Sequence, residues 1–517
     1  MKKQCKDQSS IIHTVFDCVL SYIDDDDIDT RNSFSLVSRK WCELEGLTRK
    51  NVTVHMFYSP TPSRLHQRFP LLESLTLKGY PLRSPEIASI DITPWIQDIS
   101  ASNSFKCLKE VCICGTSVHD SDLELLSRTR GKDLKVLKIC KCQGFSTDGL
   151  LHVATYCKYL RILCLKDNSI TRNDAKWLRT LASCFTCMES LDIGNTCSEW
   201  DVEDLILLAK NCSKSLESLK IHGCDLIDLV DVFSYAVNLQ DFAGGGYKKI
   251  DEYAGFKFPP KLRRMGIYRI RKSMFPVLLP LADQLRELNL RRARLDRDDE
   301  CYLIQRCPNL EVLYTDNTGH GNEKLEVIGQ FCKKLCKLKI TGFGSVSSKG
   351  LVAIAQGCLN LEYLHIRVRV VSNEAMECIG SHLKNLRNFR MTFGYAAHDQ
   401  TALPLDDGIR AMLVGCSKLK WLGIYNRELT DVGLDYIGKY GRNLRYLSLG
   451  YIGESDAGLV QLSKGCPNLR KLEIQICPFS KQTLSTLMFN VTSLRYIWVH
   501  NGRGNTYAAM IRPTFDL

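Results

Sequence analysis

The hydrophobic positions of the chain recur in a frame of 25 or 26 residues. Segments beginning at Cys307, Cys332, Cys358, Cys416 and Cys466 share the pattern C-x-x-L-x-x-L, and four of these five continue to x-I. The first leucine of the frame falls at positions 310, 335, 361, 386, 419, 444, 469 and 494, so six of the seven steps are 25 or 26 residues and one is 33. A fixed period of this length is typical of a repeat protein.

Each frame predicts a short strand followed by a helix. The alternation in L-x-x-L-x-I is the period of a strand, and stretches such as residues 430–438 carry apolar residues at helical spacing. A strand and a helix every 20 to 29 residues, on the order of 17 to 18 times, make a leucine-rich repeat, whose stacked units share one core and curve into a horseshoe. We therefore predict an α/β leucine-rich-repeat solenoid over residues 51–517.

The first fifty residues have a different pattern. One helical stripe contains Val15, Phe16, Val19, Leu20 and Ile23, and a second contains Phe34, Val37, Trp41 and Leu44. We predict that residues 1–50 form a three-helix domain, with the acidic residues 24–27 in a loop. A unit this small must pack on the repeats. Its remaining apolar surface then either binds a partner or caps the first repeat.

Composition narrows the class of protein. With 44% hydrophobic and 24% charged residues the chain is an ordinary folded protein, and no apolar run approaches a membrane span or a secretory signal. The chain has 24 cysteines, and those that recur at one place in the repeat frame are predicted to be reduced, buried thiols rather than disulfides. The net charge of +12 is spread along the chain, so direct nucleic-acid binding is not favoured.

The sequence carries no pattern typical of an enzyme or a metal site. G-x-S-x-G, P-loop, H-E-x-x-H and EF-hand motifs are missing from suitable contexts, and the one C-x-x-C, Cys184 to Cys187, has no second pair. We therefore predict a binding protein with no catalytic residues, no bound metal and no catalytic cofactor.

Several segments carry a resemblance to a known family. Ser35-Leu-Val-Ser-Arg-Lys-Trp41 resembles an F-box. Residues 60–70, 75–79, 144–151, 303–313 and 449–456 are similar to plant F-box hormone receptors, most of all the coronatine-insensitive jasmonate receptors, with the auxin receptors more distant. The resemblance runs from Ile11 to about Pro513.

The resemblance implies a function in protein degradation. The F-box would bind an SKP-type adaptor and a cullin–RING ubiquitin ligase through a set of residues that comprises Phe16, Leu20, Leu36, Val37 and Trp41. The repeats would hold a jasmonoyl-isoleucine-type hormone, and a degron of a jasmonate-ZIM-type repressor of transcription would close over it. Such a receptor acts in the nucleus, with the cytosol as an alternative.

The resemblance also assigns site residues. Hormone-binding positions would be Arg390, Lys339, Tyr425 (through its hydroxyl), Trp498, Leu449 and Arg83, and an inositol polyphosphate would contact Lys78, Lys337 and Arg292.

The chain departs from the family pattern at several of its functional positions. Leu82, Arg367 and Gln475 replace family residues around the hormone, and Cys114 and Gly115 replace paired arginines, which predicts a weakened polyphosphate site. Two alternatives therefore stay open: an F-box receptor for another ligand or degron, and a leucine-rich scaffold outside any ligase.

Overall fold

The computed structural model describes most of the chain. The described residues are 28–56, 62, 65–79, 89–101, 104–171, 176–196, 200–222, 224–245, 256–267, 269–291, 293–316, 321–342, 346–393, 404–425, 428–500 and 506–510. They form two compact units, each described here by itself. Unit 1 comprises the described residues up to His222 together with Asp231–Asn238, and unit 2 comprises those from Leu239 onward together with residues 224–230.

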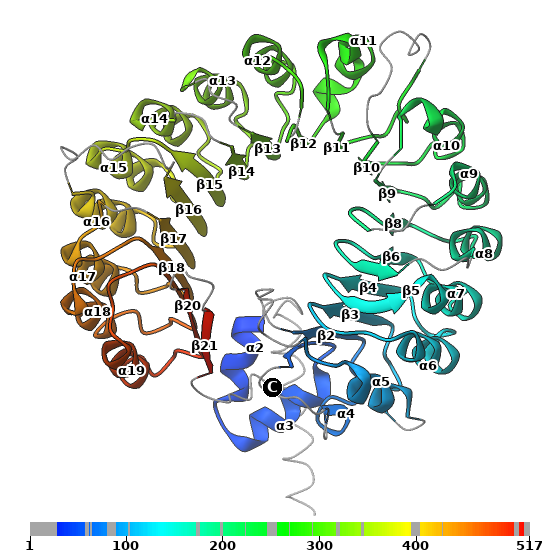
Figure 1. Cartoon of the computed structure of the whole chain (residues 1–517), viewed down its shortest axis with the longest axis horizontal. Helices are drawn as coiled ribbons and strands as arrows, with labels where there is room; N and C mark the ends of the chain where they lie inside the picture. Colours follow the sequence, from blue (N-terminus) through cyan, green and yellow to red (C-terminus); the bar gives the residue numbers. More distant parts are fainter. Residues whose placement is uncertain are drawn as a thin grey trace, which may run out of the picture. The chain divides into compact units, whose positions relative to one another are not determined.

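Unit 1 contains a parallel sheet with helices on one face (Figure 1). Its strands, in their order in the sheet, are β1 (Asn51–His55), β2 (Ser74–Lys78), β3 (Glu110–Cys114), β4 (Val136–Cys140), β6 (Ile162–Cys164), β8 (Ser190–Asp192) and β9 (Ser218–Lys220). Its helices are α2 (Ile28–Ser35), α3 (Arg39–Thr48), α4 (Leu65–Arg68), α5 (Thr93–Ser100), α6 (Asp120–Arg130), α7 (Thr147–Tyr156), α8 (Trp177–Cys184), α9 (Val202–Asn211) and α10 (Val230–Tyr235). A second, two-stranded sheet pairs β5 (Gln143–Ser146) with β7 (Ser169–Thr171).

Unit 2 repeats the same arrangement. Its strands are β10 (Asp241–Ala243), β11 (Arg264–Gly266), β12 (Glu287–Asn289), β13 (Val312–Asp316), β14 (Lys337–Thr341), β15 (Tyr363–Val368), β16 (Asn388–Phe393), β17 (Trp421–Tyr425), β18 (Tyr446–Gly450), β19 (Lys471–Gln475) and β20 (Tyr496–His500). They pair in parallel in this order, and β21 (Thr506–Met510) closes the row antiparallel to β20.

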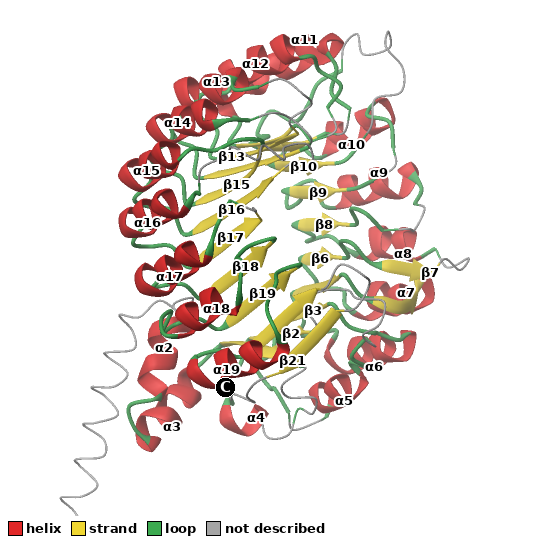
Figure 2. Ribbon diagram, turned by 60° about the vertical axis from the view of Figure 1, so that its left-hand side comes forward, coloured by secondary structure: helices red, strands yellow, loops and turns green. Residues whose placement is uncertain are grey.

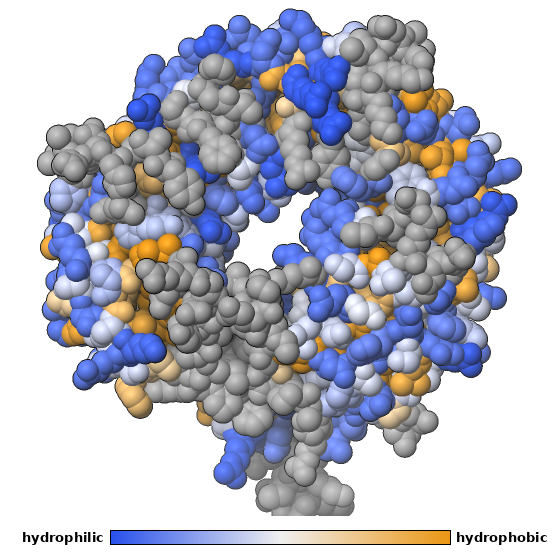
Figure 3. Space-filling view, in the orientation of Figure 1, coloured by the Kyte–Doolittle hydropathy of each residue, from blue (hydrophilic) through white to orange (hydrophobic). Residues whose placement is uncertain are grey.

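Helices of unit 2 lie on one face of this sheet (Figure 2). They are α11 (Phe275–Leu278), α12 (Arg297–Gln305), α13 (Glu323–Phe331), α14 (Ser348–Gly357), α15 (Asn373–His382), α16 (Asp406–Gly415), α17 (Asp431–Tyr440), α18 (Asp456–Ser463) and α19 (Lys481–Asn490). Short 3-10 turns are η1 (Ile227–Leu229), η2 (Lys272–Met274) and η3 (Leu279–Gln284). Hydrophilic residues dominate the surface over α12 and α13 (Figure 3). No helix among the described residues is long and apolar enough to cross a lipid bilayer.

The repeat frame explains why the strands have one buried and one open face. In β14, Leu338 and Ile340 are fully buried under the helices, whereas Lys337 and Lys339 lie on the opposite face. The alternation follows from the two-residue period of a strand. The predicted leucine-rich-repeat fold is therefore confirmed for both units.

The cysteines of the frame pack in the core, as predicted. Cys157, Cys212, Cys358 and Cys466 are at most 1% exposed, and their thiols lie against the interior of the preceding repeat. Cys466 Sγ, for example, donates to the carbonyl oxygen of Ile437 at 3.4 Å. Small, weakly polar thiols fill this position without leaving an unpaired polar group.

An aspartate in the first turn of one helix ties it to the next repeat. Asp431, at the start of α17, accepts hydrogen bonds from the Glu454 and Ser455 amides at 2.9 and 3.2 Å, and from the Ser455 hydroxyl at 2.5 Å. Asp406 binds Thr430, and Asp120 binds Ser146, in the same way. We call these contacts from an aspartate to the serine or threonine of the next repeat the aspartate ladder. Since Ser455 caps α18, the ladder satisfies backbone donors that the start of a helix leaves unpaired.

The N-terminal segment differs from its prediction in one respect. The second apolar stripe forms two helices, α2 and α3, because the chain turns at residues 36–38 and Ser38 caps the new helix by accepting from the Trp41 amide. Phe34 and Trp41 stack across this turn with ring centroids 5.2 Å apart. The predicted first helix, with Phe16 and Leu20, lies outside the described residues.

Candidate functional site

The open face of the unit 2 sheet brings predicted site residues from separate repeats side by side. Strand register places Lys339 of β14 beside His365 of β15, and His365 beside Arg390 of β16. Neighbouring strands are about 4.8 Å apart, so these side chains share one patch. We call the in-register line across the unit 2 strands the central row: Lys339, His365, Arg390, Gly423, Ser448, Glu473 and Trp498.

The Lys339 end of the central row is crowded with positive charge. Burial lowers the pKa of Lys339, and the nearby charges of Arg291, Arg390 and Lys337 lower it further. Burial, Arg390 and Lys339 likewise lower the pKa of His365 to about 4, so this imidazole is neutral at pH 7. Among the described residues, no carboxylate forms an ion pair with Lys339 or Arg390. An anionic ligand would relieve this repulsion.

Arg390 is held against aromatic rings. Its guanidinium carbon lies 5.0 Å from the centre of the Tyr425 ring and 5.8 Å from that of Trp421. A Cβ atom at Gly423 would approach the Trp421 ring to 2.8 Å and Arg390 Cγ to 3.2 Å, so glycine is needed under this stack. Arg390 Nε is buried and has no hydrogen-bond partner among the described residues. The stack fixes a guanidinium that still has donors to offer.

Tyr425 uses its hydroxyl within the protein, which corrects its predicted role. Its oxygen lies 2.6 Å from Ser448 Oγ, and Ser448 in turn donates to Glu473 Oε2 at 2.7 Å. Because the Ser448 proton goes to the carboxylate, the Tyr425 proton goes to Ser448. Tyr446 also donates to Glu473, at 2.7 Å. The Tyr425 hydroxyl therefore has no proton left for a ligand carboxylate.

Leu449 was predicted to line the pocket, and this is wrong. It is fully buried in the core, on the opposite face of β18 from Tyr446 and Ser448. A shift of one residue along a strand moves a side chain to the other face, so Ser448 takes the open-face position. Trp498 lies on the central row, in register with Glu473, but it is only 3% exposed and its ring packs 5.8 Å from that of Tyr496, so its role in a pocket stays a prediction.

The predicted polyphosphate residues are only partly described. Lys337 lies between two tyrosines on the open face of unit 2, 5.0 Å from the ring of Tyr363 and 5.5 Å from that of Tyr314. Lys78 is exposed at the end of β2 in unit 1, in register with Cys114. Arg292, together with the hormone-site residue Arg83, lies outside the described residues.

Two of the predicted adaptor-binding residues, Leu36 and Val37, are exposed, whereas Trp41 is partly buried against Phe34. Leu36 is 85% exposed and Val37 is 65% exposed, in the turn between α2 and α3. The other face of the segment packs on the first repeat, where Arg68 donates to Cys42 Sγ at 3.2 Å. Two adjacent apolar side chains held open to solvent in this way are typical of a protein interface.

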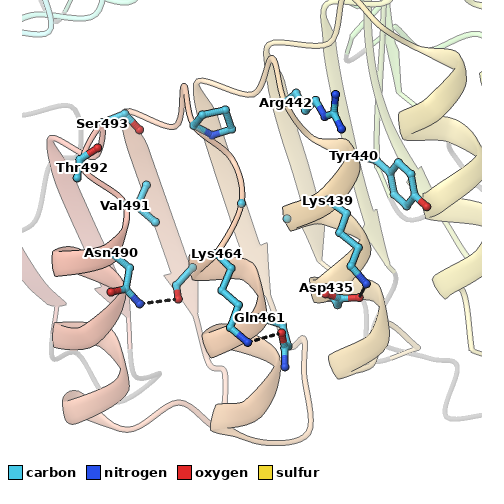
Figure 4. A pocket seen from close by; sticks show the side chains of 14 residues that line it. Asp435, Lys439, Tyr440, Arg442, Gln461, Lys464, Asn490, Val491, Thr492 and Ser493 are labelled. Carbon is cyan, nitrogen blue, oxygen red and sulfur yellow. Dashed lines mark hydrogen bonds and ion pairs between the residues drawn. The ribbon is translucent and has the colours of Figure 1, made fainter.

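Two other features were missed by the sequence prediction and carry no site. Asp91, His119 and Asp122 offer ligand atoms within 4.8 Å of one another, but Asp122 already accepts from the His119 amide at 2.8 Å as a helix cap. A groove of about 790 Å³ lies at the C-terminal ends of α17, α18 and α19 (Figure 4). Its Lys439 pairs with Asp435 at 2.6 Å, and none of the predicted site residues lines it.

Sequence reasoning also missed His365, Ser448, Glu473 and Tyr446. Three of them could have been found, because the variable residue between the last two apolar positions of each repeat falls on the central row: His365 in Leu-His-Ile, Ser448 in Leu-Ser-Leu and Glu473 in Leu-Glu-Ile. Aligning the repeats with one another predicts that row without a structure.

Known proteins show the same combination of segments. An F-box model matches residues 8–51. Coronatine-insensitive protein 1 of Arabidopsis thaliana is 41% identical over 544 residues, covering 100% of this chain and 90% of the relative. Coronatine-insensitive protein homolog 2 of Oryza sativa subsp. indica is 40% identical, covering 94% of this chain and 87% of the relative.

Two further proteins give weaker matches. GRR1-like protein 1 of Arabidopsis thaliana is 31% identical, covering 94% of this chain and 86% of that protein. Among solved structures, a chain of the Rad7–Elc1 complex in yeast gives a TM-score of 0.45 at 18% identity, over 69% of this chain and 79% of that one. With its F-box, its repeats and this identity along its full length, the chain belongs to the coronatine-insensitive family of F-box leucine-rich-repeat proteins, the substrate-recognition subunits of SCF-type ubiquitin ligases.

Proposed function

We propose that this substrate receptor is gated by an acidic small-molecule hormone. The hormone is of the jasmonoyl-isoleucine type, and the substrate is a jasmonate-ZIM-type repressor whose degron closes over the bound hormone. The observation that carries the proposal is the cation-rich end of the central row, where Lys339 and Arg390 face one patch and neither forms an ion pair with a carboxylate among the described residues. Trp421, which is only partly buried beside Arg390, offers apolar surface for the body of the hormone.

The hormone carboxylate would replace water as the partner of these cations. A hydrogen bond to a charged group contributes roughly 1.5–3 kcal/mol, so two such bonds dominate the affinity of a small ligand. Arg390 offers the planar fork that matches a carboxylate, whereas Lys339 offers a point charge. Lys339 also has its pKa lowered by burial and by the neighbouring cations, so binding an anion would raise that pKa again.

Capture of the degron with the free acid and with its methyl ester tests this assignment. The immobilised degron peptide is incubated with the chain purified with its adaptor, in the presence of either compound. We expect capture with the acid and at least tenfold less with the ester, because the ester loses the charge that Arg390 and Lys339 bind. Equal capture with both compounds would show that the carboxylate is not what the site recognises.

We also propose an inositol polyphosphate as a weakly bound, non-catalytic cofactor. The residues proposed to bind it stay those that the resemblance assigns, Lys78, Lys337 and Arg292. Cys114 lies in register with Lys78 and brings no charge where the family has arginine. Calorimetry should therefore give a dissociation constant at least tenfold weaker than that of a relative with both arginines, since two charged contacts are missing.

The family and the exposed turn of the F-box support binding of an adaptor protein. Leu36 and Val37 are placed to bind an SKP-type adaptor, which connects the receptor to the cullin–RING ligase. Any ubiquitin-transfer chemistry then belongs to partner subunits, and the chain itself is non-catalytic. Since the proposed substrate represses transcription, we propose that the receptor acts in the nucleus, which imaging of the tagged chain tests.

A second candidate is a receptor for a more polar ligand. It is favoured by the network of Ser448, Tyr446 and Glu473, which puts a carboxylate on the central row between Arg390 and Trp498. A ligand that carries an acid at one end and a hydrogen-bond donor at the other would match both ends of this row better than a purely apolar body.

A further inference from the structure

His365 lies at the centre of the cation-rich end of the central row. Strand β15 pairs with β14 on one side and with β16 on the other (Figure 1), so Lys339 and Arg390 each stand one strand away from His365. Strands in a sheet are about 4.8 Å apart, and the side chains of lysine and arginine are longer than that of histidine. Both cations can therefore reach an anion that lies above the His365 ring.

The three side chains have hydrogen-bonding groups to spare. Among the described residues, none of Lys339, His365 and Arg390 forms a side-chain hydrogen bond or an ion pair. Arg390 contacts the rings of Trp421 and Tyr425, which leaves its N–H groups unused. His365 is half-buried, and polar groups removed from water are usually paired in folded proteins. Three unpaired neighbours in one row indicate a ligand as their common partner.

A carboxylate held by the two cations has room for one more donor. Its two oxygens offer about four lone-pair sites, of which a bidentate arginine takes two and a lysine takes one. Tyr425 does not supply the remaining bond, because its hydroxyl proton goes to Ser448. A neutral imidazole carries one N–H group, so His365 can supply it.

We propose that His365 is a third ligand-binding residue of this site, whose ring N–H donates to the carboxylate that Arg390 and Lys339 hold. The inference rests on the proposed function, since it takes the hormone carboxylate as the anion bound there. His365 lies below the anion, with one cation on either side, and fills the role that the resemblance gave to the Tyr425 hydroxyl.

The charges around His365 add a property that can be measured. Burial, followed by the charges of Arg390 and Lys339, lowers the pKa of His365 to about 4, and no carboxylate among the described residues acts in the opposite direction. On its own strand the neighbours on the open face are Tyr363 and Arg367, which bring no negative charge at neutral pH. A bound carboxylate would favour the protonated imidazole and raise the pKa of His365.

Hormone binding should therefore be coupled to the uptake of a proton by His365. Between the pKa of the free protein, about 4, and the higher value in the complex, the complex holds a proton that the free protein lacks. The affinity should rise as the pH falls through this window. The hormone stays charged there, because an α-carboxyl group has an ordinary pKa of about 3.5.

Calorimetry of hormone binding tests the inference. Jasmonoyl-isoleucine is titrated into the chain, purified with its adaptor, in the presence of the degron peptide, at about pH 5 and about pH 7. Pairs of buffers with different heats of ionisation report the protons taken up on binding. We expect the wild type to take up more protons at about pH 5 than a variant that has no titratable group at position 365.

Three variants assign the effect to His365. His365→Phe fills the place of the ring without a donor and should weaken binding at least tenfold at about pH 7, because a hydrogen bond to a charged group is lost. His365→Gln keeps a neutral N–H group, so it should keep most of the affinity but lose the additional proton uptake. His382→Gln is the matched control, since His382 is exposed on α15 of the same repeat, and it should behave as the wild type does.

The outcomes separate this inference from the proposed function. Equal affinity of His365→Phe and the wild type, or proton uptake that persists in His365→Gln, would overturn the role of His365 while hormone binding stands. Binding that survives Arg390→Ala, or no hormone binding by the wild type, would overturn the proposed function and this inference with it.

Discussion

At the scale of single residues, what a side chain offers a ligand depends on what it already contacts. Tyr425 was expected to bind the hormone through its hydroxyl, yet the structure commits that hydroxyl to Ser448. Leu449 was expected in the pocket and lies in the core. Arg390 and Lys339 fall on the open face, as their places in the frame imply. The charges and open-face positions of Arg390 and Lys339 were predicted from the sequence, whereas the position of Leu449 and the hydrogen-bond partner of Tyr425 were not.

The Tyr425 assignment leads to a test with two substitutions. Tyr425→Phe keeps the ring under Arg390 and should leave hormone-dependent degron capture unchanged, at a cost of about 1 kcal/mol in the free energy of unfolding. Tyr425→Ala removes the ring and should weaken capture. Both effects can be measured by pulldown and urea unfolding. Loss of capture in Tyr425→Phe would mean that the hydroxyl does bind the ligand.

At the scale of elements, the sequence predicted strands and helices better than it predicted their boundaries. The leucine frame placed β14 to β20 because apolar alternation is a strong signal for a strand buried on one side. It did not predict the break between α2 and α3, since an apolar stripe continues across Ser38. Nor did it predict the aspartate ladder, whose partners are more than twenty residues apart.

The ladder makes a prediction about stability. Asp431→Ala leaves the Glu454 and Ser455 amides without their acceptor and should lower the free energy of unfolding by about 1–3 kcal/mol. Asp435→Ala, on the same helix, removes only an exposed pair with Lys439 and should cost less than about 1 kcal/mol. Urea unfolding of the two variants compares them, and equal losses would contradict the ladder.

Asp431 also makes the free energy of unfolding depend on pH. Burial alone would raise the pKa of Asp431, but hydrogen bonds from Ser455 and from backbone amides outweigh it and lower that pKa. A lowered pKa means that Asp431 contributes stability above its unfolded value, about 3.9, and loses it as the pH falls through the folded value. The difference between the wild type and Asp431→Ala should therefore shrink in acid.

At the scale of the whole molecule, the chain joins an adaptor-binding segment to a ligand-binding face. The F-box-like segment and the repeats were both predicted from sequence, because each carries its own apolar pattern. Aligning the repeats would have predicted which residues stand on the central row. The hydrogen bonds that join Tyr425, Ser448 and Glu473 could not be predicted in this way, because they depend on side-chain contacts that form only in the fold.

The exposed turn predicts the adaptor interface. Replacing both Leu36 and Val37 by glutamate should abolish co-purification with an SKP-type adaptor, because two charges cannot be buried in an apolar interface. Leu71→Glu changes another exposed leucine of unit 1 and should have no effect. Circular dichroism checks that the variants stay folded. Adaptor binding that survives the double substitution would place the interface elsewhere.

The central claim is that a hormone carboxylate on Arg390 controls substrate capture, and one measurement tests it most directly. Degron capture is measured with and without jasmonoyl-isoleucine for the wild type, Arg390→Ala and Arg387→Ala. Arg387 is the matched control, since its guanidinium pairs with Glu362 at 3.4 Å, away from the central row. We predict hormone-dependent capture by the wild type and Arg387→Ala, and none by Arg390→Ala. Capture that needs no hormone, or that survives Arg390→Ala, would contradict the claim.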